Sequence, residues 1–229
     1  MKDAKQMPEP AGRRQRKRQR MASHLADTAF ELFEEAGYEA VTMEQIAAEA
    51  DVAKATLYSY FPMKEALVAH RFKDEIVGGM AALADQLASH RGFVSRMRFL
   101  LGESAAWHAA KRDYLPHYLR YIHSIVDNVA GDAIREAGST ATLNALAALF
   151  RAGQQGGEVV KRIPAETLAW SLQSLLYGAV QHWLFHPETD LAESFQRAFS
   201  LLMNGAAADK ATGQPKSVAM RKTGSRKSR

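Results

Sequence analysis

Cysteine is absent from the 229-residue chain, which excludes disulfide scaffolds, thiolate nucleophiles and every zinc or iron–sulfur site that needs cysteine ligands. Several catalytic signatures are missing as well. The chain has no GxSxG nucleophile elbow, no P-loop, no HExxH pair and no dinucleotide-binding fingerprint. It also shows neither an alternating strand pattern nor an internal repeat. These absences argue against an enzyme and against a β architecture.

Long stretches without charge are rare. The longest, residues 167–187, is long enough to span a bilayer, but its polar side chains Ser171, Gln173 and His182 are distributed around a helix, so we predict a helix covered by protein. The basic N-terminus is followed by carboxylates and not by the apolar segment of a signal peptide. The sequence therefore predicts a cytoplasmic protein that does not associate with a membrane.

The net charge of +5 hides an uneven distribution. Residues 1–20 hold eight basic and two acidic residues, residues 205–229 hold seven and one, and acidic residues dominate between them. The ends have too few apolar groups to offset the entropy of ordering, so we predict a disordered basic arm over 1–15 and a disordered basic tail over 206–229. The run RRQRKRQR, residues 13–20, is either a solvated arm or one that follows DNA phosphates or enters a minor groove.

Helical periodicity begins near residue 16 and ends at Gly37. Thr42 and Gln45 then have the spacing of a capping box, which predicts a short helix over 43–50. A second short helix is predicted from about residue 53 to 60, because Pro62 disfavours helical conformation in the preceding residue. Two short helices joined by a tight turn, with a third packed behind them, predict a helix-turn-helix domain over 16–62.

Only helical patterns follow, so the fold class is all-α, with a helical-bundle domain over 63–205. The predicted helices of this bundle are 63–90, 93–112, 116–137, 140–155, 165–185 and 190–204.

The segment TMEQIAAEADVAKATLYSYFPMKEALV, residues 42–68, together with AFELFEEAGYEAV before it, closely resembles the N-terminal DNA-binding domain of the TetR family of transcriptional regulators. The resemblance covers about fifty residues, and its specific part comprises Thr42, Ile46, Ala47, Val52, Thr56, Leu57, Tyr58, Tyr60, Phe61 and Lys64. It implies a helical C-terminal domain that binds a small effector and dimerises through its last two helices. The sequence departs from the family pattern at Asp51, Ala53 and Ala55, where glycine, a hydroxyl cap and glycine are common.

A helix of two turns fits the major groove with its N-terminus outward. With Val52, Leu57 and Phe61 turned inward, the outward residues predicted to read bases are Lys54, Ala55, Thr56 and Ser59, with Tyr60 beside them. The resemblance assigns contacts with the DNA backbone to Thr42, Tyr58, Tyr60 and Lys64. Purely structural roles stay open: a helix cap for Thr42, packing against the first helix for Tyr58 and a solvated amine for Lys64.

A helix without charge from Thr167 onward must be covered on several sides, which predicts a homodimer through helices 165–185 and 190–204. Two-fold symmetry then predicts a pseudo-palindromic double-stranded operator, with half-sites about 34–36 Å apart or a multiple of that. An effector pocket between the middle helices would be lined by aromatic and polar side chains. The candidates are Trp107, His108, Tyr118, Tyr121, Phe150, Trp170, Gln173 and Tyr177.

No cofactor is expected. His182 and His186 lie four residues apart, but no further histidine or cysteine is near them in sequence, so no metal site is predicted. Three hypotheses remain. The leading one is a dimeric repressor released from its operator by a small-molecule effector of unknown identity, and the others are a DNA-binding regulator without an effector and an all-helical enzyme.

Overall fold

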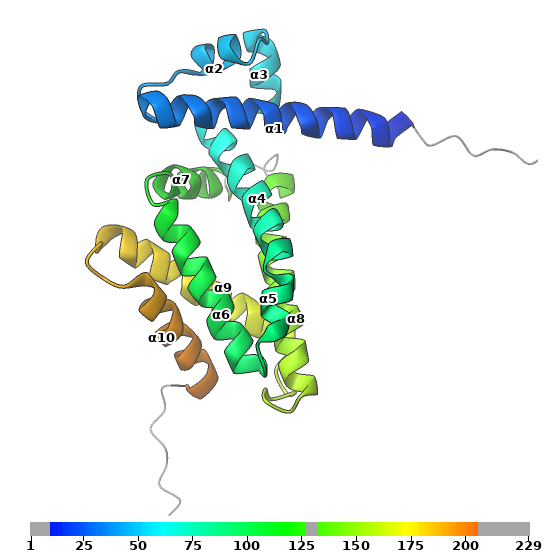
Figure 1. Cartoon of the computed structure of the whole chain (residues 1–229), viewed down its shortest axis with the longest axis vertical. Helices are drawn as coiled ribbons and strands as arrows, with labels where there is room; N and C mark the ends of the chain where they lie inside the picture. The colour runs from blue at the N-terminus through cyan, green and yellow to red at the C-terminus, as the bar shows by residue number, and fades with distance from the viewer. Residues whose placement is uncertain (1–9, 127–131, 206–229) are drawn as a thin grey trace, which may run out of the picture.

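A computed structural model of the protein describes residues 10–126 and 132–205 (Figure 1). This part of the chain contains no strand, and its helices confirm the predicted all-α class. They are α1 (Pro10–Ala36), α2 (Met43–Glu49), α3 (Lys54–Tyr60), α4 (Lys64–Ala82), α5 (Ala84–Ser89), α6 (Phe93–Ala110), α7 (Leu115–Val126), α8 (Asp132–Gln155), α9 (Ala165–Phe185) and α10 (Leu191–Asn204).

The first three helices form a compact unit in which α2 and α3 lie on one side of α1 (Figure 1). Leu25, Ile46, Leu57 and Phe61 are almost fully buried in its core. The predicted capping box is present, since the Gln45 amide donates to Thr42 Oγ1 at 3.2 Å and the Thr42 amide donates to Gln45 Oε1 at 2.7 Å. The capping box therefore sets the start of α2.

Helix α1 begins at Pro10, six residues before the predicted start at residue 16. Residues 10–15, predicted to belong to a disordered arm, therefore continue the helix. Apolar periodicity does not extend to these residues, but arginine, lysine and glutamine favour helix by their intrinsic propensity, and proline is favoured at a first helical position. The remainder of the predicted arm and the predicted C-terminal tail lie outside the described residues.

Two other helix boundaries differ from the prediction. The expected helix 63–90 is interrupted at Leu83, a half-buried residue between exposed neighbours that follows the weak helix formers Gly78 and Gly79. The break expected between helices 116–137 and 140–155 is absent at Gly138, and α8 instead runs from Asp132 to Gln155. An interior glycine costs a helix about 1 kcal/mol, which tertiary packing can offset.

The remaining helices form the larger body. α4 leaves the three-helix unit, packs on α1 and continues between α7 and α8, while α9 is flanked by α8 and α10 (Figure 1). The body is built around fully buried side chains that include Phe72, Met97, Phe150, Leu172 and Phe195. Among the described residues, no helix has both the length and the hydropathy needed to cross a membrane.

Candidate nucleic-acid interface and ligand cavity

Helix α3 presents its polar side chains to solvent as the spacing predicts. Lys54, Ala55 and Ser59 are exposed, Thr56 and Tyr60 are half-buried, and Tyr58 exposes 45% of its surface. On the opposite side Leu57 and Phe61 are buried, and Val52 is half-buried against the same core. This geometry leaves one face of a two-turn helix free to enter a groove.

Two polar contacts shape the exposed face. Lys54 Nζ lies 3.4 Å from Glu44 Oε1, and both side chains are largely exposed. The pKa of Glu44 is lowered by its own backbone amide and by Lys54. An ion pair in water is worth little, so Lys54 can exchange this partner at small cost. Ser59 Oγ donates to the carbonyl of Thr56 at 2.7 Å, which leaves its oxygen as an acceptor.

Lys64 has a structural role in addition to any contact with DNA. Its Nζ donates to the carbonyls of Tyr38 at 2.7 Å and Val41 at 2.8 Å, and it lies 4.4 Å from the centroid of the Tyr38 ring. These contacts tie the start of α4 to the loop between α1 and α2. An ammonium group has three donors, so one remains for the predicted phosphate contact.

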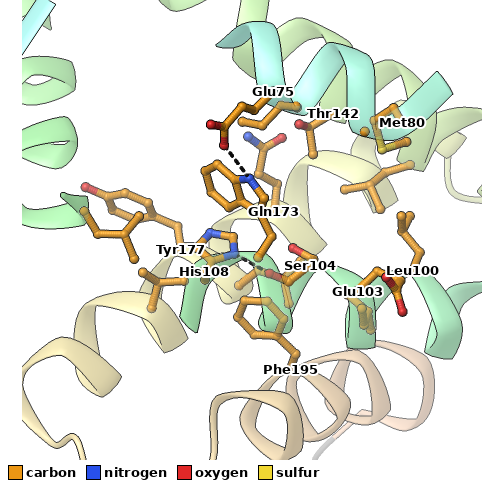
Figure 2. Close-up of a pocket in the computed structure, with 18 of the residues that line it drawn as sticks. Glu75, Met80, Leu100, Glu103, Ser104, His108, Thr142, Gln173, Tyr177 and Phe195 are labelled. Carbon is orange, nitrogen blue, oxygen red and sulfur yellow. Dashed lines mark hydrogen bonds between the residues drawn. The ribbon is translucent and has the colours of Figure 1, made fainter. Parts of the chain in front are cut away.

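The predicted effector residues converge only in part. A cavity of about 300 Å³ lies within the body, and Trp107, His108, Tyr118, Gln173 and Tyr177 line it (Figure 2). Trp170 does not, because it faces outward from α9 and exposes 64% of its surface. Phe150 and Tyr121 are buried but lie outside the lining, and Phe150 packs against Phe93 at 5.2 Å between ring centroids.

Most of the cavity wall is apolar and comes from helices α4, α6, α7, α8, α9 and α10. The apolar lining residues are Ile76, Met80, Leu83, Leu100, Leu101, Leu115, Leu119, Ile122, Leu146, Leu176, Val180 and Phe195. Sequence reasoning missed this wall, along with the polar residues Glu75, Glu103, Ser104 and Thr142. Glu103 and Ser104 precede Trp107 and His108 by one helical turn, so helical spacing alone provided a signal for these two residues.

His108 supplies an acceptor to the cavity. Its Nδ1 lies 2.7 Å from the carbonyl oxygen of Ser104 (Figure 2), and a carbonyl can only accept, so Nδ1 carries the proton in this contact. Burial lowers the pKa of His108, which favours the neutral ring and leaves Nε2 as a hydrogen-bond acceptor. The described lining contains two carboxylates and no lysine or arginine.

Glu75 connects the cavity wall with the three-helix unit. Its Oε1 accepts from Arg71 Nε at 3.0 Å and Lys111 Nζ at 2.9 Å, and its Oε2 accepts from Trp107 Nε1 at 3.2 Å. Burial raises the pKa of Glu75, but the hydrogen bonds from Lys111, Arg71 and Trp107 and the charge of Lys111 together lower it by more. The net shift of the pKa is therefore downward. Arg71 also pairs with Asp27 of α1. A continuous ionic path therefore runs from the cavity to α1.

A second contact joins the two parts of the molecule. The ring of Tyr38, in the loop after α1, stacks on the ring of His117 in α7 with centroids 3.8 Å apart. Arg120 of α7 pairs with Glu65 of α4 at 3.3 Å. These contacts connect α4 and α7 with the loop that precedes α2.

The arrangement of a helix-turn-helix unit on a helical body defines a DNA-binding transcriptional regulator. Residues 25–70 match the family described as bacterial regulatory proteins, tetR family. The chain is 26% identical over 190 residues to a Mycobacterium tuberculosis protein named as a mycofactocin biosynthesis transcriptional regulator, MftR, a match that spans 83% of this chain and 93% of that protein. The helix-turn-helix unit of this protein therefore matches the N-terminal domain of the TetR family of regulators.

Solved structures share the fold over most of the chain. Thermus thermophilus FadR, a TetR family transcriptional repressor in complex with lauroyl-CoA, is 24% identical with a TM-score of 0.72 and covers 85% of this chain and 99% of its own. Bacillus subtilis FadR in complex with stearoyl-CoA is 19% identical with a TM-score of 0.60, over 80% of this chain and 98% of that one.

Proposed function

We propose that this protein is a dimeric repressor that binds a pseudo-palindromic operator through α3 and is released when an apolar effector enters the cavity. The observation that carries the proposal is that α4 is joined to the helix-turn-helix unit and also forms part of the cavity wall. This helix begins directly after the helix-turn-helix unit, and its residues Glu75, Ile76 and Met80 form part of the cavity wall. A ligand that displaces α4 would change the position of α3 on DNA.

The effector acts through a difference in affinity for two conformations. It shifts the protein away from the DNA-binding state only to the extent that it binds the other state more tightly. Such couplings are typically about 1–3 kcal/mol, which corresponds to a change in operator affinity of roughly 5-fold to 150-fold. The Arg71–Asp27 pair and the Tyr38–His117 stack join α4 and α7 to the three-helix unit, so their geometry is expected to differ between the two states.

The effector class that we propose is an acyl thioester such as an acyl-CoA. The apolar lining suits a hydrocarbon chain, and about 300 Å³ lies at the lower end of the size range of ligand pockets. A free fatty acid would bring its carboxylate toward Glu75 and Glu103, whereas a thioester is uncharged where the chain enters. The charged phosphates of the carrier would remain outside. The FadR complexes with lauroyl-CoA and stearoyl-CoA support the same class.

On the DNA side, Lys54 donates to guanine in the major groove, and Ala55 or the methyl group of Thr56 contacts a thymine methyl group. Ser59 lies on the same exposed face. Contacts with the phosphates come from Thr42, Tyr58, Tyr60 and Lys64, which fix position but carry no sequence information. Replacing Lys54 and Tyr58 with alanine should abolish the operator footprint, and an unchanged footprint would contradict the assignment of α3.

The dimer forms through α9 and α10. Their outer surface exposes large apolar side chains: Trp170 at 64%, Phe185 at 79%, Tyr177 at 37% and Leu201 at 48%. Large apolar side chains exposed on two neighbouring helices are typical of an interface. Sedimentation of a Trp170→Ser, Phe185→Ser variant should show monomers at concentrations at which the native chain is a dimer.

The effector proposal is tested by measuring operator affinity with a series of ligands. An operator selected from random duplexes is titrated in the presence of lauroyl-CoA, stearoyl-CoA, unacylated CoA or laurate. The acyl-CoAs should weaken binding, and CoA and laurate should not. Ser104→Phe fills the cavity and should abolish the response, whereas Ala106→Phe changes an exposed residue of the same helix outside the lining. Equal responses of both variants would place the effector elsewhere, and no response to any acyl-CoA would favour a regulator without such an effector.

A further inference from the structure

The first turns of α1 form an exposed cationic helix. Between Pro10 and Arg20 the helix carries six basic residues and no acidic residue, and residues 12–20 are all exposed. The basic residues are Arg13, Arg14, Arg16, Lys17, Arg18 and Arg20. Figure 1 shows this end of α1 projecting beyond the other helices of the three-helix unit. It contributes nothing to the core.

This segment is electrostatically unfavourable by itself. Arg14 and Arg18 are four residues apart, as are Arg13 and Lys17, and like charges at this spacing repel each other. Cations near a helix N-terminus also oppose the helix dipole. A polyanion relieves both effects, so the partner that fits this surface is strongly negative.

The position of one side chain relates this surface to α3. The guanidinium of Arg18 lies 5.4 Å from the centroid of the Tyr60 ring at the end of α3. Arg18 shares a stripe of α1 with the core residues Leu25 and Ala29, and Arg14 occupies the same stripe one turn earlier. The cationic stripe therefore lies beside the C-terminal end of α3.

Another face of the same helix carries other cations. At about 100° per residue, Arg13 and Arg20 point roughly 100–160° around the helix from Arg14 and Arg18. All four side chains are exposed. The chain thus offers two pairs of arginines with equal charge, only one of which lies on the side of α3.

We propose that Arg14 and Arg18 bind phosphates of the DNA duplex that flanks the half-site contacted by α3. Charge complementarity and the position beside α3 support this assignment, which rests on operator binding through α3. The contacts are independent of base sequence, and they extend the region of DNA that each protomer covers. Each neutralised phosphate steepens the salt dependence of affinity by about 0.9 log unit per log unit of salt, so two contacts add roughly 2 per protomer.

The test compares two double variants of the full chain, Arg14→Gln with Arg18→Gln and Arg13→Gln with Arg20→Gln. Thermal unfolding first establishes that both fold as the native chain does. Affinity is then measured against salt on a minimal operator and on one extended by a helical turn at each end. The native chain and the Arg13, Arg20 variant should bind the extended operator more tightly. The affinity of the Arg14, Arg18 variant should increase little when the operator is extended. The slope of its log affinity against log salt concentration should be shallower by roughly 2 per protomer.

Equal losses in the two double variants would overturn the proposal, because they would indicate general attraction and not contact. A strong preference for A·T over G·C flanks would also overturn it, since this would indicate insertion into the minor groove. Failure of the native chain to bind any selected operator would overturn the proposed function, and this inference with it.

Discussion

Replacing Glu75 with glutamine should destabilise the protein at neutral pH and have little effect in acid. Glutamine keeps the shape and one acceptor oxygen but removes the charge that pairs with Arg71 and Lys111. The side chains of Glu75 and Lys111 are 21% and 25% exposed, which is intermediate between a surface pair and a buried one. Surface pairs contribute about 0–1 kcal/mol, and loss of one partner of a buried pair costs about 3–5 kcal/mol. We therefore expect a loss of about 2 kcal/mol.

The pH dependence follows from the direction of the shift. The folded protein lowers the pKa of Glu75 below that of the unfolded chain, so the stabilisation is complete above the unfolded pKa and is lost as pH falls through the folded pKa. A loss of about 2 kcal/mol lowers Tm by roughly 4–8 °C for a domain of this size. Calorimetry of the native and variant chains at equal concentration, at pH 7 and at pH 3, measures both effects.

Glu103→Gln provides the control, because Glu103 is an exposed carboxylate of the same cavity wall. It should change stability by less than about 0.5 kcal/mol. The reasoning is refuted if Glu75→Gln is as stable as this control at pH 7, or if its deficit is as large at pH 3 as at pH 7.

Three further predictions concern stability. Thr42→Ala should lower the free energy of unfolding, measured in urea, by about 1 kcal/mol, and Thr42→Ser should lower it much less, because serine retains the capping oxygen. Equal losses in the two variants would contradict the capping role. Gly153→Ala should destabilise by about 1–3 kcal/mol, because its Cβ would lie 2.7 Å from Val159 Cγ2 and 2.8 Å from the Phe93 ring. Gly102→Ala, with nothing within 4 Å of a Cβ, should stabilise by roughly 0.5–1 kcal/mol. Burial in the folded state lowers the pKa of His108, so as pH falls the imidazole is protonated in the unfolded chain before it is protonated in the folded one. The native chain should therefore lose more free energy of unfolding between about pH 7.5 and 5.5 than His108→Gln. Parallel plots of that free energy against pH for the two chains would show that His108 is not responsible.

The helix-turn-helix was predictable because its signals are local. The Thr42–Gln45 pair, the left-handed Asp51 with φ of 51° and the break at Pro62 each act within a few residues. The early start of α1 was not predicted because apolar periodicity does not register the helix propensity of polar residues. The interruption at Leu83 follows the weak helix formers Gly78 and Gly79, and tertiary packing decides whether a helix continues past such residues.

The cavity was only partly predictable for a related reason. Aromatic residues at helical spacing pointed to Trp107, Tyr118 and Tyr177, but the same criterion selected the exposed Trp170. Glu75 was missed because a carboxylate on α4 resembles any solvated helix residue until its partners Arg71, Lys111 and Trp107 are known. Which side of a helix faces a cavity depends on contacts between segments distant in sequence.

The central claim is that ligand in the cavity and operator on α3 are coupled. The most direct measurement determines the affinity for lauroyl-CoA with and without operator, and the affinity for operator with and without lauroyl-CoA. Thermodynamic linkage requires both ratios to be the same. We predict that each ligand weakens binding of the other by one common factor, roughly 5-fold to 150-fold, and that Ser104→Phe reduces the factor to one. Binding of lauroyl-CoA that leaves operator affinity unchanged would contradict the account.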